Sequence, residues 1–220
     1  MIATNTAAKP SRVPTRGLYD LSGERLPPLP GTAEEVASVA IIAGPRSIVL
    51  TGAKATESGL RSQPLDRVRI MHLATHGISS TDSPERAALV LARGTPDDDG
   101  LLQAREISEL NLGAELVTLS ACDTGAGRLV GQEGIVNLVR AFQFAGARTV
   151  VASLWAADDV FTTSLMKRFY GNLAKGLDRG SALQRAKLEL VEQFGEQAVP
   201  FLWAGFTMVG DASRPISFSE

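Results

Sequence analysis

Hydrophobic residues along this 220-residue chain follow two alternating patterns, one typical of strands and one typical of helices. Short runs of β-branched and apolar residues, bounded by turn residues, predict strands. These runs lie at 47–50, 67–77, 87–92, 115–121, 148–155 and 203–210. Between them, apolar residues at helical spacing predict helices that begin near positions 32, 56, 102, 133, 158 and 178. Because strands and helices alternate, we expect βαβ units and an α/β fold around a mostly parallel sheet.

Capping residues indicate where several of these helices begin. Thr32 is the predicted N-cap of the first helix, with Glu34 and Glu35 in the turn where carboxylates favour the helix dipole. The other predicted N-caps are Thr56, Asp178 and either Asp158 or Asp159. The stretch RGTPDDDG at 93–100 is predicted to be an acidic surface loop.

Residues 26–215 are predicted to form one domain. No internal repeat and no convincing boundary interrupts this region. Residues 1–25 are rich in Pro, Gly, Ser and Thr and are interpreted as a flexible or incomplete lead-in. The LPPLPG stretch at 26–31 then predicts a stiff extended segment that docks on the domain.

Composition narrows the classes of function. The formal net charge is −2, so no global basic field favours direct contact with nucleic acid or anionic lipid. No apolar run is long enough to cross a bilayer, and the N-terminus has no signal-peptide pattern. The single cysteine excludes an internal disulfide, which fits a reducing cytoplasm. We therefore expect a cytoplasmic protein without a metal or other cofactor.

The single cysteine, Cys122, is the first candidate for chemistry. It follows the predicted strand 115–121, and His76 comes at the end of the predicted strand 67–77. If the two strands are neighbours, both residues lie on the rim where α/β proteins collect reactive groups. An imidazole activates a thiol as a nucleophile and can then protonate the leaving amine. The backbone N–H groups of Gly77 and Cys122 are the natural candidates for an oxyanion hole.

Each residue also has a structural interpretation. A lone cysteine is more often a small buried apolar residue, and a lone histidine is more often structural. His72 lies inside the predicted strand and is interpreted as a core or rim histidine. Its i, i+4 spacing from His76 suits zinc on a helix, but this segment is predicted to be a strand. A phosphate-binding loop at 125–134 is a competitor, although its glycine spacing does not match the dinucleotide motif.

A substrate pocket is a second candidate feature. Asp158 and Asp159 come just after the predicted strand 148–155, either as helix-capping acids or as an acidic pocket wall. Trp155 is either a pocket platform or part of the core. Asp123 is next to the thiol, where a carboxylate would raise the cysteine's pKa. We therefore expect Asp123 to point away from the sulfur or to face substrate.

Taken together, these motifs resemble the CHAT domain, a family of caspase-like cysteine peptidases in the clan of caspases, separases and gingipains. The resemblance rests on HLATHG, LSACDTG, RAFQFAGA, VVASLWAADD, FY at 169–170 and GSALQRAKL, in the family's order over about residues 26–210. It implies a caspase-hemoglobinase fold, a three-layer sandwich, with His76 as general base and Cys122 as nucleophile. It also implies that the Gly77 and Cys122 amides form the oxyanion hole.

The resemblance extends to the pocket and to regulation. SLWAADD is similar to the separase segment that forms the specificity pocket, and by position the pocket acid is Asp159, with Asp158 as the alternative. Family members begin with an extra strand that residues 1–25 do not clearly show, so the strand has degenerated or the chain is cut from a longer protein. CHAT domains are commonly effectors joined to sensor domains.

The expected function is a bacterial cysteine endopeptidase that cleaves a specific protein partner under the control of a sensor domain or partner protein. Two alternatives stay open. One is a catalytically silent caspase-like interaction module, and the other is a nucleotide-binding α/β domain that uses the 125–134 loop.

Overall fold

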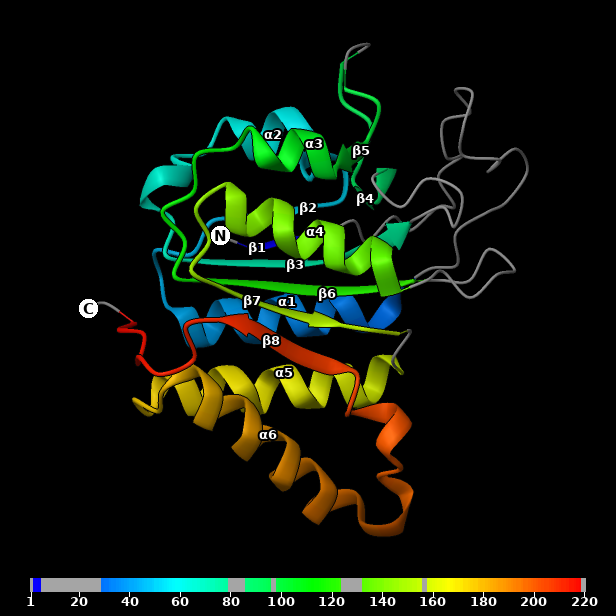
Figure 1. Ribbon diagram of the computed structural model, residues 1–220, viewed down its shortest axis with the longest axis vertical. Coiled ribbons are helices and arrows are strands. Elements are labelled where there is room, and N and C mark those ends of the chain that lie inside the picture. Colours follow the sequence, from blue (N-terminus) through cyan, green and yellow to red (C-terminus); the bar gives the residue numbers. More distant parts are fainter. Residues whose placement is uncertain are drawn as a thin grey trace.

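The structure is a computed structural model that describes residues 2–4, 29–78, 86–95, 98–123, 132–155 and 158–218. Its described strands form one sheet (Figure 1) in which six strands follow one path. In spatial order these are β2 (Val49–Thr51), β1 (Ile2–Thr4), β3 (Ile70–Ile78), β6 (Leu116–Asp123), β7 (Thr149–Ser153) and β8 (Phe206–Gly210). The strands from β2 to β7 are parallel, and β8 is antiparallel to β7.

A hairpin extends the sheet beside β3. It consists of β4 (Ala88–Val90) and β5 (Leu101–Gln103), with β4 antiparallel to the end of β3. Figure 1 shows the hairpin at the same end of the sheet toward which β3 and β6 point. The predicted fold class is confirmed, and the antiparallel members are β4, β5 and the closing strand β8.

Helices cover both faces of the sheet, so the fold has three layers (Figure 1). One face carries α2 (Glu57–Arg61), α3 (Ala104–Ser108) and α4 (Gln132–Phe144), and the other carries α1 (Pro30–Ala43), α5 (Asp159–Ala174) and α6 (Arg179–Phe194). Short 3-10 turns lie at Gly52–Lys54, Leu65–Arg67, Gly195–Gln197 and Pro200–Leu202. No helix in the described part of the chain is both long and apolar enough to cross a membrane.

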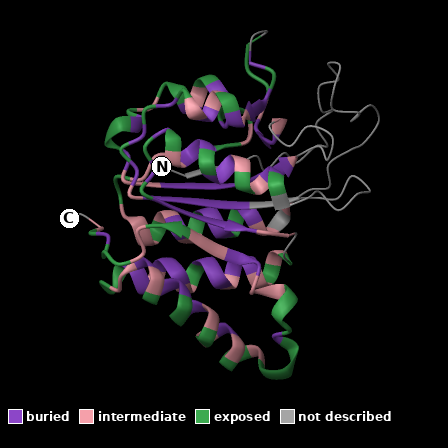
Figure 2. Cartoon of the chain, in the orientation of Figure 1, coloured by how far each residue is buried: buried purple, intermediate pink, exposed green. Residues whose placement is uncertain are grey.

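Strand alternation divides the core in two. In β3, Met71 and Leu73 pack on the α4 face, whereas Ala74 packs on the α1–α5 face. Both sets are fully buried, which is why these strands have nearly continuous apolar sequences rather than alternating ones. Figure 2 shows the buried strands between helices whose outer sides are exposed.

The predicted N-caps are largely confirmed. Thr56, Asp158 and Asp178 each accept backbone N–H bonds at the start of α2, α5 and α6. The prediction for Thr32 was wrong, because α1 already begins at Pro30, whose fixed φ suits the first turn. The Thr32 hydroxyl instead donates to the Leu29 carbonyl, at 2.7 Å.

The sequence patterns did not predict β1. This three-residue strand lies between β2 and β3, with Ile2 opposite His72. A strand this short has too few positions to show a period, and the rest of 1–25 lies outside the described residues.

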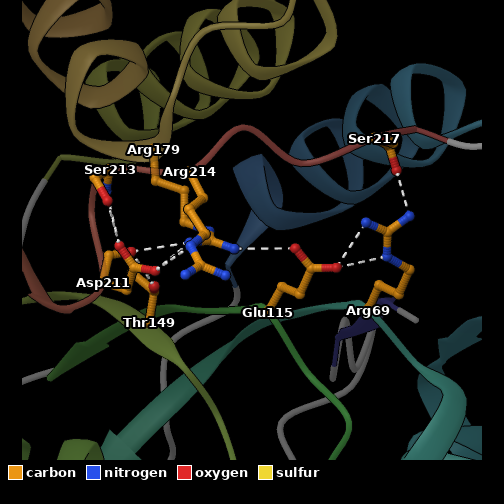
Figure 3. Close-up of polar contacts among 8 residues, drawn as sticks. All are labelled: Arg69, Glu115, Thr149, Arg179, Asp211, Ser213, Arg214 and Ser217. Atoms are coloured by element: carbon orange, nitrogen blue, oxygen red, sulfur yellow. Dashed lines mark hydrogen bonds and ion pairs between the residues drawn. The ribbon is translucent and has the colours of Figure 1, made fainter.

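An ionic cluster around the buried Arg179 ties the C-terminal segment to the amino ends of β3 and β6 (Figure 3). The Arg179 side chain is fully buried and donates to Glu115 Oε2 and to the Asp211 carbonyl, each at 3.0 Å. Arg69 holds the other Glu115 oxygen and donates to the Ser217 carbonyl. Because Arg69 and Glu115 directly precede their strands, this cluster lies at the opposite end of the sheet from His76 and Cys122.

Candidate functional site

His76 and Cys122 are directly opposite each other in neighbouring parallel strands. They are Cα partners in the β3–β6 ladder, and the next pair along is Gly77 with Asp123. Opposite residues on parallel strands share a face, and both positions fall on the face covered by α1 and α5. The predicted neighbouring of the two strands is therefore confirmed at the level of the backbone.

The two residues lie inside the strands rather than just beyond them. β3 continues to Ile78, and β6 continues to Asp123. The His76 side chain is only 5% exposed. Residues 121–123 are described by their strand pairing alone, so the side chains of Cys122 and Asp123 lie outside the description. The roles predicted for all three side chains stay predictions.

Gly77 has a strand on each side. It is paired with Leu89 of β4 and with Asp123 of β6. This places its backbone beside Cys122 at the carboxyl end of the sheet, where the oxyanion-hole prediction requires it. The hydrogen-bonding role of the Gly77 amide stays a prediction.

His72 is a core histidine, as one sequence interpretation expected. It is fully buried, with Nδ1 3.1 Å from the Tyr170 hydroxyl and Nε2 3.0 Å from Glu35 Oε1. The Tyr170 hydroxyl in turn donates to Thr118 Oγ1 at 2.8 Å. Burial raises the pKa of Tyr170 far above its ordinary value, so this hydroxyl stays protonated. The network joins α1, α5 and the β3–β6 pair on the face that carries the dyad positions.

Sequence reasoning missed Glu35 and Tyr170 as members of this network. A signal was available for Glu35, since it shares the helical stripe of Val39, four residues on, and that stripe faces the core. His72 and His76 both lie in the strand β3, so their i, i+4 spacing is not that of a helical zinc motif. Among the described residues, no three His, Cys, Asp or Glu side chains converge to hold a metal.

Trp155 reaches the same edge of the sheet. Leu119 of β6 is opposite Ala152 of β7, so Cys122 and Trp155 each come three residues further along. The indole N–H donates to the Phe201 carbonyl at 2.7 Å, and its ring stacks on Phe201 with 5.9 Å between centroids. Phe201 is 61% exposed, so the stacked pair presents an aromatic surface at this edge.

The two aspartates at the start of α5 have different partners. Asp158 caps the helix, with Oδ1 accepting from Val160 N at 2.9 Å and Phe161 N at 3.1 Å. Asp159 Oδ2 accepts from the Gly31 amide at 3.3 Å and so links the starts of α5 and α1. Both residues are at the carboxyl end of the sheet, and their role in a substrate pocket stays a prediction.

Two sequence predictions concern segments that are not fully described. The proposed phosphate loop at 125–134 is one, because residues 124–131 are not described. The other is the acidic surface loop at 93–100, of which 96 and 97 are not described. Within that loop residues 93–95 and Asp99 are exposed, as expected of a surface loop, whereas Asp98 is buried.

Comparison with known proteins places the chain in a family. The sequence model of the CHAT domain matches residues 5–211. Tetratricopeptide repeat protein 28 of Mus musculus is 34% identical over 110 residues, and that of Homo sapiens is 29% identical over 145 residues. These alignments cover 50% and 66% of this chain, but the chain spans only 4% and 5% of the length of these relatives. The expected bacterial origin stays a prediction, since both of these relatives are mammalian.

Solved structures agree on the fold. The Arg specific cysteine proteinase gingipain R (RGPB) superposes with a TM-score of 0.62 at 12% identity, over 98% of this chain and 46% of that chain. A complex of the pro- and mature domains of Porphyromonas gingivalis RgpB gives a TM-score of 0.59 at 12% identity, over 98% and 48% of the two chains. The chain therefore has a caspase-like fold and belongs to the CHAT domain family.

Proposed function

We propose that this chain is a cysteine endopeptidase that uses His76 and Cys122 as a catalytic dyad. The observation that carries the proposal is the β3–β6 register, in which these two residues are direct partners on one face of the sheet. Neighbouring parallel strands are about 4.8 Å apart, so side chains at paired positions can reach hydrogen-bond distance. Membership of a family of caspase-like peptidases supports the same reaction class.

The reaction follows from the two groups. His76 accepts the Sγ proton of Cys122, and the thiolate attacks the carbonyl carbon of the scissile peptide. The resulting oxyanion is stabilised by the backbone N–H groups of Gly77 and Cys122. Collapse of this intermediate breaks the C–N bond, and His76 returns its proton to the leaving amine. Water, deprotonated by His76, then hydrolyses the thioester and regenerates the thiol.

The substrate binds along the carboxyl edge of the sheet. Trp155, Asp158 and Asp159 follow β7 at this edge, and Asp123 follows Cys122 in β6. We assign these four residues to the walls of the substrate pocket, with Asp159 as the acid that selects a basic side chain. The similarity in fold to gingipain R, an Arg specific cysteine proteinase, supports testing Arg and Lys peptides first.

A partner controls the enzyme. The curated relatives are named as tetratricopeptide repeat proteins, and this chain matches a small part of their length. We propose that a repeat-containing segment or a separate partner protein presents the substrate or aligns the dyad. The protein acts in the cytoplasm, in keeping with its single thiol.

The decisive experiment digests a peptide library with the chain and with its Cys122→Ala variant. We expect cleavage by the wild type, and loss of both cleavage and labelling by a peptidyl acyloxymethyl ketone in the variant. Far-UV circular dichroism verifies that the variant is folded. Cleavage that survives Cys122→Ala would refute the assignment. If a basic preference emerges, Asp159→Asn should weaken it, whereas the exposed control Asp66→Asn should not.

A silent interaction module is the main alternative. Under this alternative, the acyloxymethyl ketone labels Cys122 no faster than it labels free cysteine, with or without candidate partners. Equilibrium titration with ATP and GTP separately tests the nucleotide-binding alternative. Saturable binding of either nucleotide would favour that alternative over the peptidase.

A further inference from the structure

Two buried carboxyl groups meet between α2 and the β4–β5 hairpin. Glu57 is the first residue of α2, and Asp98 lies in the segment that joins β4 to β5. Each is only 6% exposed. Glu57 Oε1 accepts from the Gly100 amide at 3.0 Å, one residue before β5 begins. Asp98 Oδ2 accepts from the Ser58 amide at 3.0 Å and from the Ser58 hydroxyl at 2.7 Å. The two carboxyl groups therefore connect the helix and the hairpin in both directions.

One oxygen of this pair lacks a donor. Asp98 Oδ1 is buried and has no hydrogen-bond partner. Glu57 is adjacent in sequence to Ser58, whose amide and hydroxyl both donate to the other Asp98 oxygen, so the two carboxyl groups belong to the same buried site. Two carboxylates offer only acceptors, so a hydrogen bond between them needs a proton on one of them. A protonated Glu57 would be such a donor for Asp98 Oδ1.

The surrounding charges favour that proton. Burial is the largest effect on Glu57, followed by the negative charges of Glu106 in α3, Asp98 and Asp99, and together they raise its pKa to about 7. Burial acts in the same direction on Asp98, but the hydrogen bonds from Ser58 and from Glu57 outweigh it and lower the pKa of Asp98. The pKa values of Glu57 and Asp98 are therefore shifted in opposite directions, as expected for two carboxyl groups that share one proton.

We propose that Glu57 and Asp98 share one proton, and that this proton fastens the β4–β5 hairpin to α2. Above neutral pH the proton is released to solvent, which leaves two carboxylates in the same buried site. The segment that joins β4 to β5 is then held less firmly to α2. Among the described residues, no three acidic, histidine or cysteine side chains converge on a metal, so the proton is the counter-charge that the geometry favours.

The hairpin contacts the candidate catalytic base. Val90 of β4 is the ladder partner of His76, and the Thr75 hydroxyl donates to the Val90 carbonyl. Two residues after Val90, the Ala92 amide donates to the Ala55 carbonyl beside α2 at 2.9 Å, which fixes the start of the segment that joins β4 to β5. Glu57 and Asp98 are thus positioning residues that act on His76 through β4. This last step rests on the proposed peptidase function, whereas the shared proton does not.

Amide hydrogen exchange on the full chain tests the proton directly. The readout is the opening of residues 88–103 between pH 6 and pH 8.5, corrected for the intrinsic pH dependence of exchange. We expect the opening constant of the wild type to rise about tenfold across this range. In Glu57→Gln, the side-chain amide can accept from Gly100 and donate to Asp98 at every pH, so the opening constant should not depend on pH. The exposed Glu109→Gln, with the same charge change nearby, should behave as the wild type does.

Three outcomes would overturn the proposal. One is pH-independent opening in the wild type, and another is the same rise in Glu57→Gln. The third is full protection of the wild type restored at pH 8.5 by millimolar Ca²⁺ or Mg²⁺, which would make the pair a cation site. If Glu57→Gln does not fold, carbon-13 carboxyl NMR of the wild type decides: a Glu57 pKa near 4.5 contradicts the shared proton. None of these measurements depends on peptidase activity.

Discussion

Glu35 Oε1 lies 3.0 Å from His72 Nε2 in the interior of the protein, with the two side chains 2% and 0% exposed. The distance is that of an ion pair, but neither atom meets the geometry of a hydrogen bond. Because the Tyr170 hydroxyl donates to Thr118 Oγ1, its oxygen can accept from His72 Nδ1 in the tautomer that carries a proton on that nitrogen. Glu35 is thus the partner that remains for the other ring nitrogen.

Replacing Glu35 by alanine should strongly destabilise the fold. Removal of Glu35 leaves the buried His72 Nε2 without its neighbouring polar group, and an unsatisfied buried polar group costs about 1–3 kcal/mol. The neighbouring Glu34 pairs with Lys167 at the surface, and such pairs contribute at most about 1 kcal/mol. Chemical denaturation of Glu35→Ala and Glu34→Ala compares the two positions. Equal losses at both would show that the Glu35–His72 contact contributes little.

The free energy of unfolding should also depend on pH through Glu57. Its pKa is about 7 in the folded protein, against 4.5 as the ordinary value, so the folded state binds more protons between these values. The stabilisation is therefore fully present below about pH 4.5 and is lost as pH rises through 7. The total loss is up to about 3 kcal/mol, at 1.4 kcal/mol per pKa unit.

Denaturant titrations at pH 5, 6, 7 and 8 measure this dependence. Glu57→Gln should be less dependent on pH than the wild type over this range, because the amide does not ionise. The same slope in both proteins would assign the dependence to other groups.

Much of the fold could be predicted from sequence, because the signals were local. Thr56, Asp158 and Asp178 cap helices by contacts within three residues, and the apolar run at 148–155 contains a fully buried strand. The His76–Cys122 register was reachable because both residues come near the ends of parallel strands. What could not be predicted depends on long-range contacts, such as Glu57 with Gly100. No periodicity indicates which carboxyl groups the fold brings together.

Arg179 should be the dominant residue of the cluster that holds the C-terminal segment. It is fully buried, donates to Glu115 and to the Asp211 carbonyl, and its Nε has no partner. Arg179→Ala removes one of the two cations that neutralise the Glu115 carboxylate and opens a cavity. We therefore expect the free energy of unfolding to fall by about 3–5 kcal/mol. Arg214 lies beside Asp211 and is 70% exposed, so Arg214→Ala should lower the free energy of unfolding by at most about 1 kcal/mol.

Arg179→Met separates charge from packing. Methionine fills most of the arginine volume, so a smaller loss than in Arg179→Ala would assign part of the effect to packing. Thermal unfolding monitored by circular dichroism, at low and at high salt, measures all three variants. If Arg179→Ala lowers the melting temperature no more than Arg214→Ala does, the role assigned to Arg179 in this cluster is contradicted.

Gly205 should be the residue that keeps Trp155 stacked on Phe201. A Cβ at this position would lie 2.8 Å from Trp155 Cε2 and 3.0 Å from Ser153 Oγ, closer than real contacts allow. Gly205→Ala should therefore displace the indole and cost about 1–3 kcal/mol, as overpacking does. Gly171 in α5 is the matched control, because a Cβ there meets nothing within 4 Å. Gly171→Ala should stabilise the helix by up to about 1 kcal/mol. Tryptophan fluorescence in a Trp203→Phe background reports on Trp155 alone, and an unchanged spectrum in Gly205→Ala would show that the indole is not held by this contact.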